Sequence, residues 1–571
     1  MAELSKQLLY PGNLKKSFET RLEKAGKSDL VSGILRKNPV VFRKKEKAHQ
    51  KLIASRLGWI EIAREMQDEV DRIEQFVKDV KDDGLKHFLL LGMGGSSLGP
   101  EVWQKVFGPA SWLKSFHIAD TTVPTTLKKI TESVDLRTTF VVISSKSGTT
   151  METLAQYRYF FRLIKDLRPL KAGTNFGAIT DDGSEVHRIS RRNRFRELFL
   201  NREDIGGRFS ALSYFGLVPA AFTKANLKNI VGGAVEFLND METNPTSNAA
   251  LELGAFLAAG AMDNFDKLHL QATPELAPFI SWIEQLIAES TGKDEKGILP
   301  VNSGSNNDCF SKADDRLYVY FNLKGKRLPA HVQSFNRSRT PAVVIELADP
   351  HALGAEMLKW EMAVSVASAI MGVNPFDEPN VAESKKNTLA VLDAKKGRRI
   401  IVPDPPLCTL EEIIFEFDTD VPGIDRRRNI SADEIMPKFV EGLKKGDYVS
   451  LLCYGEKNNE VDKRLTKVRD LLEKHDCITV HQGYGPRYLH SVGQFHKGGR
   501  QNGHFLVFEQ EYQEELDIPK LNISFNRLIS AQAEGDIKAL RKRNRPVVHV
   551  KLRTDPIKGL DKFIELLGAV K

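Results

Sequence analysis

The sequence predicts an α/β protein with several domains, each built on a parallel sheet that helices cover on both faces. The chain has 571 residues, more than one hydrophobic core usually serves, and this length favours about two to four domains. From residue 86 onward, short apolar runs alternate with longer amphipathic stretches. Such alternation is typical of βαβ units, in which helices join successive parallel strands.

Four segments follow one another along the chain. An N-terminal arm is predicted at residues 1–60, which are polar and of helical pattern. Residues 61–230 form a first α/β domain and residues 231–445 a second, and a C-terminal α/β unit occupies residues 446–571. The predicted strands are the apolar runs at 87–95, 115–120, 139–148, 176–181, 318–323, 342–349, 448–455 and 477–483.

A weak internal sequence repeat relates the second segment to the last. Pro341, Leu347 and Asp349-Pro350 precede one predicted helix, and Pro546, Leu552 and Asp555-Pro556 precede the final one with similar spacing. This repeat favours duplicated α/β units.

The composition excludes several classes of protein. Hydrophobic residues make up 41% and charged residues 28% of the chain, as in an ordinary globular protein. We expect a cytoplasmic protein without membrane association, because no apolar run is long enough to span a bilayer and the N-terminus lacks a signal-peptide pattern. The net charge of +8 is scattered over basic runs without interleaved aromatics, so we expect a phosphorylated small molecule and no nucleic acid as partner.

Cysteine and histidine spacing gives no metal-site pattern. The four cysteines (Cys309, Cys408, Cys453 and Cys477) lie far apart and are expected to be reduced. The histidines at 481, 490, 496 and 504 fit no compact ligand spacing. The sequence therefore predicts neither a metal nor an organic cofactor.

Two loops follow predicted strands and lead into predicted helices. Gly94, Gly95 and Ser96 form a glycine-rich turn after the first strand, without the spacing of a dinucleotide or ATP site. The second loop is richer in hydroxyl groups: Ser145, Lys146, Ser147, Thr149 and Thr150. Free backbone N–H groups and the helix dipole favour an anion at such a position, so this loop can bind a phosphate. The alternative is a Ser/Thr-rich cap that only begins a helix.

These loops belong to a set of five motifs that resembles the phosphoglucose isomerase family, which is built from α/β domains of the sugar-isomerase (SIS) type. The motifs are GMGGSSLGP (92–100), SSKSGTTMET (144–153), GGRFS (206–210), AESTGK (288–293) and NPFDEPNVAESK (374–385). The closest likeness is to the isomerase half of bacterial transaldolase and phosphoglucose isomerase fusions. The resemblance implies tandem three-layer SIS domains, a homodimer, and reversible isomerisation of glucose 6-phosphate to fructose 6-phosphate through a cis-enediol.

The resemblance also implies catalytic roles for two residues. Glu289 matches the carboxylate that moves a proton between C1 and C2, and partial burial would raise its pKa and make it a usable base. Arg208, which follows Gly207, matches the arginine that stabilises the enediolate. Glu152 matches a carboxylate that orients the catalytic histidine. Without the resemblance, these residues would be read as a solvated helix glutamate, a surface arginine and a partner of the helix dipole.

Ring opening is assigned to two further residues by the same resemblance. Lys385 matches the lysine of the family's FDQxxVExxK arrangement, although Glu378 stands where many members have glutamine and Ala382 where they have glutamate. His490 lies in LHSVGQ, a motif that many bacterial members carry before the FDQ segment, and here it follows Lys385. We therefore expect a rearranged or circularly permuted second half. His496 is the second candidate, and a solvated lysine and a buried core histidine are the plain alternatives.

Two other functions remain open at this point. A dual phosphoglucose and phosphomannose isomerase could share the same proton shuttle. A phosphosugar-binding regulator would need the hydroxyl-rich loop but not Glu289, Arg208, His490 and Lys385 together, and their joint presence favours an enzyme.

Overall fold

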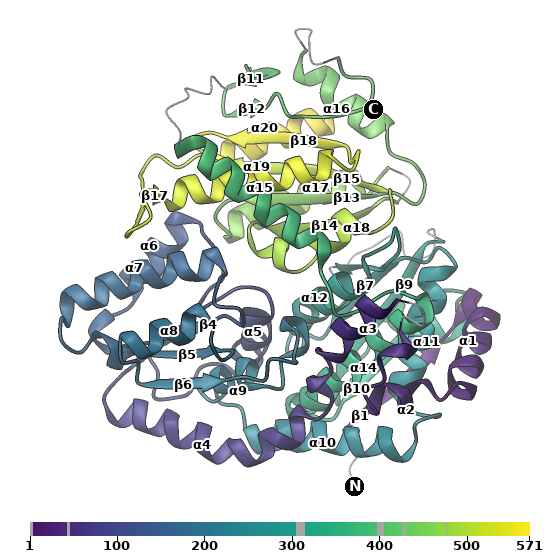
Figure 1. Ribbon diagram of the computed structural model, residues 1–571. Coiled ribbons are helices and arrows are strands. Elements are labelled where there is room, and N and C mark those ends of the chain that lie inside the picture. The colour runs from purple at the N-terminus through teal and green to yellow at the C-terminus, as the bar shows by residue number, and fades with distance from the viewer. Residues whose placement is uncertain are drawn as a thin grey trace. The chain divides into compact units, whose positions relative to one another are not determined.

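The computed structural model divides into two compact units (Figure 1). It describes residues 4–42, 46–303, 314–396, 405–425, 430–475 and 477–570. Unit 1 comprises the described residues within Met1–Asp120, Ile130–Asn307 and Asp314–Asp377, and unit 2 those within Thr121–Lys129 and Glu378–Lys571. The first and second predicted α/β segments thus contribute to unit 1 up to Asp377, and most of unit 2 lies beyond that residue.

The first sheet of unit 1 is entirely parallel. Its order is β3-β2-β4-β5-β6, and its central strands are buried along their whole length, as expected for a sheet covered on both faces. The strands are β2 (His87–Gly92), β3 (Ser115–Ala119), β4 (Thr139–Ser144), β5 (Phe176–Thr180) and β6 (Glu197–Leu200). The accompanying helices are α4 (Ile62–Asp82), α5 (Gly95–Phe107), α7 (Met151–Leu167), α8 (Glu185–Arg192) and α9 (Tyr214–Ala220), and α6 (Pro124–Ser133) has its first six residues in unit 2 and its last four in unit 1. The strand order reverses between β2 and β4, which is where parallel α/β sheets bind ligands.

The second sheet of unit 1 has the order β1-β10-β9-β7-β8. Its strands are β1 (Ser5–Tyr10), β7 (Lys267–Ala272), β8 (Leu299–Asn302), β9 (Arg316–Leu323) and β10 (Ala342–Leu347). The helices are α1 (Lys15–Lys27), α2 (Leu30–Leu35), α3 (Lys47–Ala54), α10 (Leu227–Thr243), α11 (Ala249–Met262), α12 (Phe279–Thr291), α13 (Ala330–Gln333) and α14 (Leu353–Met371). The predicted helical arm therefore starts with a strand, because β1 pairs antiparallel with β10, a partner more than 300 residues away.

Unit 2 contains a six-stranded sheet of order β11-β12-β18-β15-β13-β14. Its strands are β11 (Cys408–Leu410), β12 (Ile413–Phe415), β13 (Tyr448–Tyr454), β14 (Thr479–Tyr484), β15 (Gly503–Gln510) and β18 (Val547–Leu552), and β16 (Asp517–Ile518) pairs separately with β17 (Ile523–Ser524). The helices are α15 (Pro379–Lys396), α16 (Ala432–Glu441), α17 (Asn459–Leu472), α18 (Gly493–Gly498), α19 (Phe525–Arg541) and α20 (Pro556–Gly568).

The second and third sheets share one topology. In each, four parallel strands have the order second, first, third, fourth, and an antiparallel strand flanks the fourth. The residues of the weak sequence repeat lie at corresponding positions in the two sheets, because Pro341 precedes β10 and Pro546 precedes β18. This agreement supports duplication of an α/β unit.

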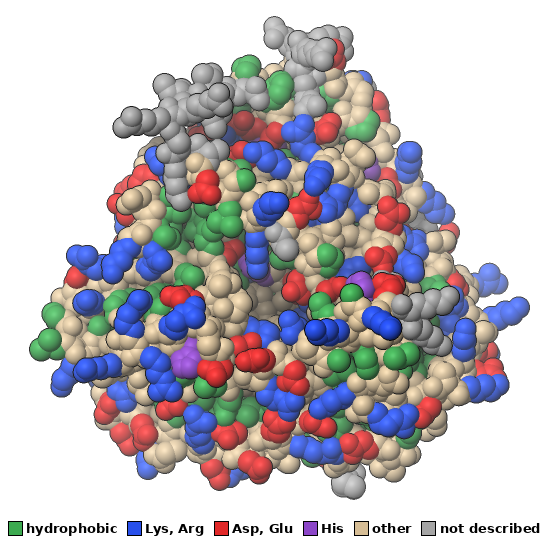
Figure 2. Space-filling view, in the orientation of Figure 1, with side chains coloured by type: hydrophobic (Ala, Val, Ile, Leu, Met, Phe, Trp, Pro, Cys, Tyr) green, Lys and Arg blue, Asp and Glu red, His purple; other side chains and the backbone are tan. Residues whose placement is uncertain are grey.

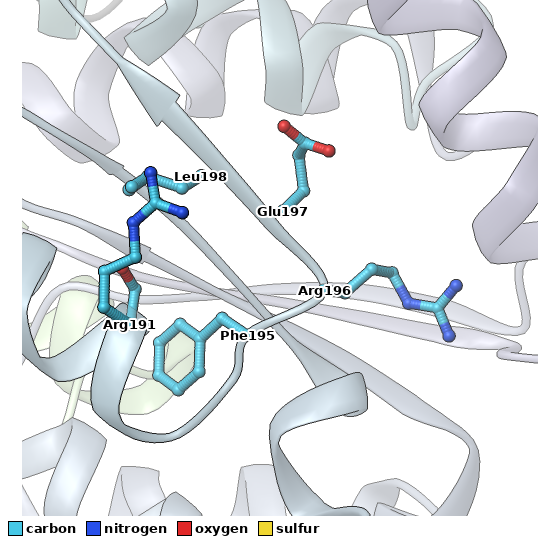
Figure 3. Close-up of a pocket in the computed structure, with 6 residues that line it drawn as sticks. Arg191, Phe195, Arg196, Glu197 and Leu198 are labelled. Carbon is cyan, nitrogen blue, oxygen red and sulfur yellow. The ribbon is translucent and has the colours of Figure 1, made fainter.

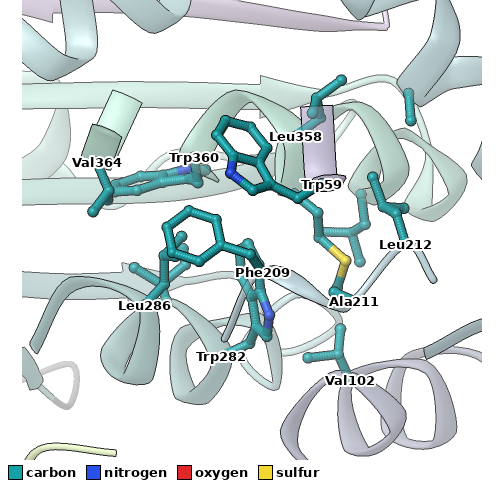
Figure 4. Packing of buried hydrophobic residues seen from close by; sticks show 14 of the residues in the cluster. Trp59, Val102, Phe209, Ala211, Leu212, Trp282, Leu286, Leu358, Trp360 and Val364 are labelled. Carbon is teal, nitrogen blue, oxygen red and sulfur yellow. The ribbon is translucent and has the colours of Figure 1, made fainter. Parts of the chain in front are cut away.

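Each unit has its own hydrophobic core. Trp59, Phe209, Trp282 and Trp360 are completely or almost completely buried in unit 1 and belong to one cluster that includes residues from both of its sheets (Figure 4). A separate cluster in unit 2 surrounds Phe415, Phe508 and Phe563. Continuous packing of this kind holds the strand ends, and the loops that follow them, in fixed positions.

The cysteines differ from expectation. Cys408 and Cys453 are free thiols, but Cys477 is disulfide-bonded, and Cys309 lies outside the described residues. The prediction of four reduced cysteines is therefore wrong for Cys477, because spacing along the chain does not reveal which side chains approach in space.

No helix in the described ranges combines the length and hydropathy of a membrane span. On the face shown in Figure 2, lysine and arginine side chains are interspersed with aspartate and glutamate.

Candidate active site

The glycine-rich turn after β2 contacts the GGRFS segment. Gly94 has a φ of 57°, which favours glycine. A Cβ on Gly95 would lie only 1.9 Å from the carbonyl oxygen of Gly207, so any side chain there would separate the two segments. Ser96 is largely buried in the first turn of α5. These glycines allow two backbone segments that are distant in sequence to meet at the carboxyl end of the sheet.

The hydroxyl-rich loop leaves β4 beside that turn, because Gly92 and Ser144 are paired at the ends of adjacent strands. Ser145 is buried and its hydroxyl donates to Thr150 Oγ1 at 3.2 Å. Ser147 and Thr149 are exposed, and their hydroxyl oxygens lie 2.9 Å apart. Thr150 is the residue before α7. Hydroxyl groups therefore surround the N-terminus of a 17-residue helix, an arrangement that suits a phosphoryl group.

Lys146 is the one cation of this loop, and its charge is already paired. The ammonium group forms an ion pair with Asp181 and donates to the carbonyl oxygen of Glu203 at 2.8 Å. A paired ammonium contributes less to binding an anion than an unpaired one would.

Arg208 lies in the short 3-10 helix Gly207–Phe209 and is only 4% exposed. Its Nη1 donates to Glu289 Oε2 at 3.2 Å and its Nε donates to Ser290 Oγ at 2.9 Å. Nη2 donates to the carbonyl oxygens of Pro375 at 2.6 Å and Asp377 at 3.0 Å. The planar fork of the guanidinium thus fixes the segment before Glu378 relative to the glutamate.

Glu289 is in the last turn of α12 and is 6% exposed. Besides Arg208, it accepts from Gln285 Nε2 at 3.4 Å. Unit 1 therefore brings together the residues predicted to be the base and the enediolate stabiliser, although they are 81 residues apart in sequence.

Aromatic side chains pack next to the segments that carry Arg208 and Glu289. Phe209, next to Arg208, has its ring centroid 5.2 Å from that of Trp59 and 5.1 Å from that of Phe376. Trp282, on the same helix as Glu289, belongs to the same core (Figure 4). Because close-packed rings leave little room for adjustment, the core determines the backbone position of both charged residues.

The segment leading to Glu378 is held by Lys293. This buried lysine forms an ion pair with Asp377 at 2.9 Å and also donates to the carbonyl oxygen of Asn374. Asn374 Nδ2 in turn donates to Asp377 Oδ2 at 3.0 Å. Glu152, in the first turn of α7, is buried.

The remaining predicted residues are in unit 2. Lys385 is exposed on α15, and His490 is half-buried at the end of the 3-10 helix Arg487–His490. His496, the second candidate, is fully buried, with Nδ1 3.0 Å from the Tyr448 hydroxyl and Nε2 3.2 Å from Ser450 Oγ. Burial, together with the nearby His481 and Lys497, lowers the pKa of His496 far below its usual value. These features of His496 match a core histidine, so His490 is the better candidate for ring opening.

Sequence reasoning assigned no role to Gln285 and Ser290, both buried polar partners of the central pair. Gln285 lies four residues before Glu289 on one helix, and side chains with this spacing meet on one face. That spacing is a signal that could have identified Gln285. Ser290 could be recognised only from the three-dimensional contact with Arg208.

A shallow pocket elsewhere on the first sheet is lined by Arg191, Phe195, Arg196, Glu197 and Leu198, together with Ser190 (Figure 3). It lies at the amino end of β6, whereas the loops above follow the carboxyl ends of β2 and β4. Arg196 is paired with Asp83, and Glu197 with Arg72. Its position and its paired charges separate it from the candidate site.

Comparison with known proteins gives consistent results. The phosphoglucose isomerase family model matches residues 58–305. Glucose-6-phosphate isomerase of Mesomycoplasma hyopneumoniae (strain 7448) is 26% identical over 386 residues, covering 58% of this chain and 89% of that protein. The enzyme of the same name from Bacillus cereus (strain AH187) is 24% identical over 392 residues, covering 59% and 86%.

Solved structures share the fold. A hypothetical protein from Thermus thermophilus has a TM-score of 0.58 and 22% identity, covering 68% of this chain and 99% of its own. A glucose-6-phosphate isomerase from Chlamydia trachomatis has a TM-score of 0.54 and 17% identity, covering 66% and 86%. These likenesses show that the chain shares an α/β fold with parallel strands with both structures. Residues 58–305, which contain four of the five motifs, match the phosphoglucose isomerase family model, and the curated relatives that match 58–59% of the chain are named glucose-6-phosphate isomerase.

Proposed function

We propose that this chain interconverts glucose 6-phosphate and fructose 6-phosphate. The observation that supports this most directly is the buried contact between Arg208 and Glu289, next to the glycine-rich turn at Gly95. The curated relatives that the chain matches carry the name glucose-6-phosphate isomerase. A carboxylate, a guanidinium and a phosphate-binding loop are the groups that an aldose–ketose exchange requires.

The phosphoryl group of the substrate is bound by the loop from Ser145 to Thr150. Backbone N–H groups at the start of α7 and the hydroxyls of Ser147 and Thr149 donate to its oxygens. Gly94, Gly95 and Ser96 line the adjacent turn and leave room for the sugar. Binding at one end of the substrate orients the reacting carbons, and this orientation reduces the entropic part of the barrier.

Proton transfer is the task of Glu289. Its carboxylate removes the proton from C2 of the open-chain aldose and returns it to C1, and the reverse reaction runs in the opposite order. The electrons of the broken C2–H bond form a C1–C2 double bond while the carbonyl π electrons move to O1, and Arg208 stabilises the negative oxygen of the resulting cis-enediolate. A proton then passes from O2 to O1, and protonation of C1 leaves the carbonyl group at C2. No electron leaves the substrate, so the step balances without a redox partner.

Ring opening is the task of unit 2. His490 donates a proton to the ring oxygen as the bond between that oxygen and the anomeric carbon breaks, the anomeric hydroxyl loses its proton in the same step, and Lys385 assists with its positive charge. From the resemblance we assign to Glu152 the role of the carboxylate that orients the histidine, and Glu378 occupies the sequence position of the glutamine found in many relatives. We propose further that the protein acts as a cytoplasmic homodimer, binds no nucleic acid or membrane, and resembles the isomerase half of bacterial transaldolase and phosphoglucose isomerase fusions.

The direct test is a coupled assay. Fructose 6-phosphate is supplied, and glucose 6-phosphate is followed through its dehydrogenase, with and without EDTA. We expect turnover that EDTA does not reduce. The absence of any product at high enzyme concentration would leave the phosphosugar-binding regulator as the better account. Mannose 6-phosphate as a second substrate distinguishes a dual isomerase from a single one.

A further inference from the structure

A buried carboxylate in unit 2 joins three segments of the chain. Asp536, on α19, is 1% exposed. It accepts a hydrogen bond from Ser384 Oγ at 3.2 Å and another from the Tyr488 hydroxyl, and it forms an ion pair with Lys497 at 2.6 Å. Three donors therefore come from α15, from the turn before His490 and from α18.

Two of these segments contain the residues assigned to ring opening. Ser384 immediately precedes Lys385 on α15, and Tyr488 lies two residues before His490. Lys497 adds a second link, because its ammonium group also donates to the carbonyl oxygen of Gly493 at 3.1 Å, inside the LHSVGQ motif. A shift of any segment would leave part of the buried carboxylate without a donor.

A pair of hydrogen bonds between uncharged groups also joins the α15 segment to the LHSVGQ motif. Gln494 is fully buried, its Oε1 accepts from the Asn380 backbone N–H at 2.9 Å, and its Nε2 donates to Asn380 Oδ1 at 2.7 Å. Asn380 is two residues after Glu378. The α15 segment and the LHSVGQ motif are thus connected twice, once by charge and once by an amide.

The chemistry of the cluster explains why it defines a single geometry. A carboxylate that is removed from water is stable only when all its partners are present, so it penalises alternative packing. Burial and the neighbouring Asp536 raise the pKa of the Tyr488 hydroxyl well above its usual value, so it stays protonated and donates. Tyr454 reinforces it, with its hydroxyl oxygen 2.9 Å from that of Tyr488.

We propose that Asp536 is a positioning residue for ring opening: it holds the His490 turn and the Lys385 helix in one fixed arrangement through Tyr488, Lys497 and Ser384. The inference rests on the proposed isomerase function. Asp536 acts through these neighbours and does not contact the substrate.

The test compares a cyclic substrate with one that is already open. The open substrate is a fructose 6-phosphate analogue without the 5-hydroxyl, which cannot close the furanose ring. Its C1 hydrogen exchange with D₂O is followed by NMR, and this exchange needs Glu289 but no ring opening. The main variant is Asp536→Asn combined with Lys497→Met, which avoids an unpaired buried ammonium. The second variant is Tyr488→Phe, which deletes only one hydroxyl.

We expect the double variant to lower kcat for fructose 6-phosphate about 10- to 100-fold, with exchange of the open analogue within about twofold of wild type. Tyr488→Phe should show a smaller loss of the same kind. In a His490→Ala background, the double variant should cause no further loss for the cyclic substrate, because its effect passes through His490.

A matched control is Glu509→Gln, which alters another carboxylate of unit 2 that is 6% exposed and bonded to His549. It should leave the ratio of cyclic to open turnover unchanged. Equal losses on both substrates, or unchanged kcat in both the double variant and Tyr488→Phe, would overturn the positioning role. A wild-type protein that acts on neither substrate would instead refute the proposed function.

Discussion

Two buried ion pairs, one in each unit, use the same physics for different purposes. Arg208 and Glu289 lie 3.2 Å apart with side chains 4% and 8% exposed, whereas Lys497 and Asp536 lie 2.6 Å apart with both at 1%. The first pair stands beside the loops at the carboxyl ends of β2 and β4, and the second lies beneath the segments with Lys385 and His490. The comparison teaches that a buried charge can take part in chemistry only where loops leave access, and otherwise it serves to fix geometry.

The largest expected effect comes from breaking the first pair. Arg208→Ala leaves the buried Glu289 carboxylate without its cation, so we expect unfolding free energy to fall by about 3–5 kcal/mol. Loss of enediolate stabilisation should lower kcat by about 10²–10³-fold. Urea unfolding and the coupled assay measure the two effects.

Arg208→Lys is the control for this prediction. It keeps the charge but loses the planar fork, so stability should return in part while kcat stays low. Full activity in Arg208→Lys would contradict the importance of the bidentate geometry.

Strands with an unbroken apolar run could be predicted from the sequence, whereas a strand interrupted by a buried lysine and a buried histidine could not. Strands β2 and β4 contain continuous apolar runs, and the loops after them contain recognisable glycine and hydroxyl patterns. β7 was missed because Lys267 and His269 interrupt its apolar pattern. The structure shows Lys267 buried and paired with Asp266 at 2.8 Å and Asp315 at 3.0 Å.

Asp536 illustrates the limit for the site. On an amphipathic helix it looks like an ordinary solvated carboxylate. Its three partners come from segments 39 to 152 residues away, and only the fold brings them together. The pairing of Glu289 with Arg208 could be inferred from the family resemblance, but its distance and its partners could not.

The buried imidazole of His549 in unit 2 extends the comparison to the pH dependence of stability. His549 Nδ1 lies 2.8 Å from Asp418 Oδ1, and Nε2 lies 3.0 Å from Glu509 Oε2. Burial alone would lower the pKa of this imidazole, but the two carboxylates outweigh it and raise the pKa to about 10. Because the folded pKa lies above the unfolded value of about 6.5, the stabilisation is complete below that pH and is lost as pH rises towards 10.

We therefore expect the unfolding free energy of unit 2 to decrease by on the order of 3 kcal/mol between pH 6.5 and 10. Calorimetric unfolding at several pH values measures this change. His549→Gln, which cannot be charged, should flatten that dependence. An identical pH profile in both proteins would show that the imidazolium contributes nothing.

The smallest effect is expected at Lys146. Its ammonium is already paired with Asp181, with side chains 23% and 14% exposed, so Lys146→Met should raise KM by no more than about tenfold and leave kcat nearly unchanged. Ser147→Ala combined with Thr149→Val should raise KM more. A larger KM increase for Lys146→Met than for the double variant would assign phosphate binding to the lysine.

The most direct measurement of the central claim is C1 hydrogen exchange of fructose 6-phosphate in D₂O for wild type and Glu289→Gln. This substitution keeps the size of the side chain and can still hydrogen-bond with Arg208. With unchanged thermal unfolding as the control for folding, we predict rapid exchange in wild type and a rate lower by about 10³-fold or more in the variant. Exchange at the wild-type rate in Glu289→Gln would contradict the assignment of this carboxylate as the base.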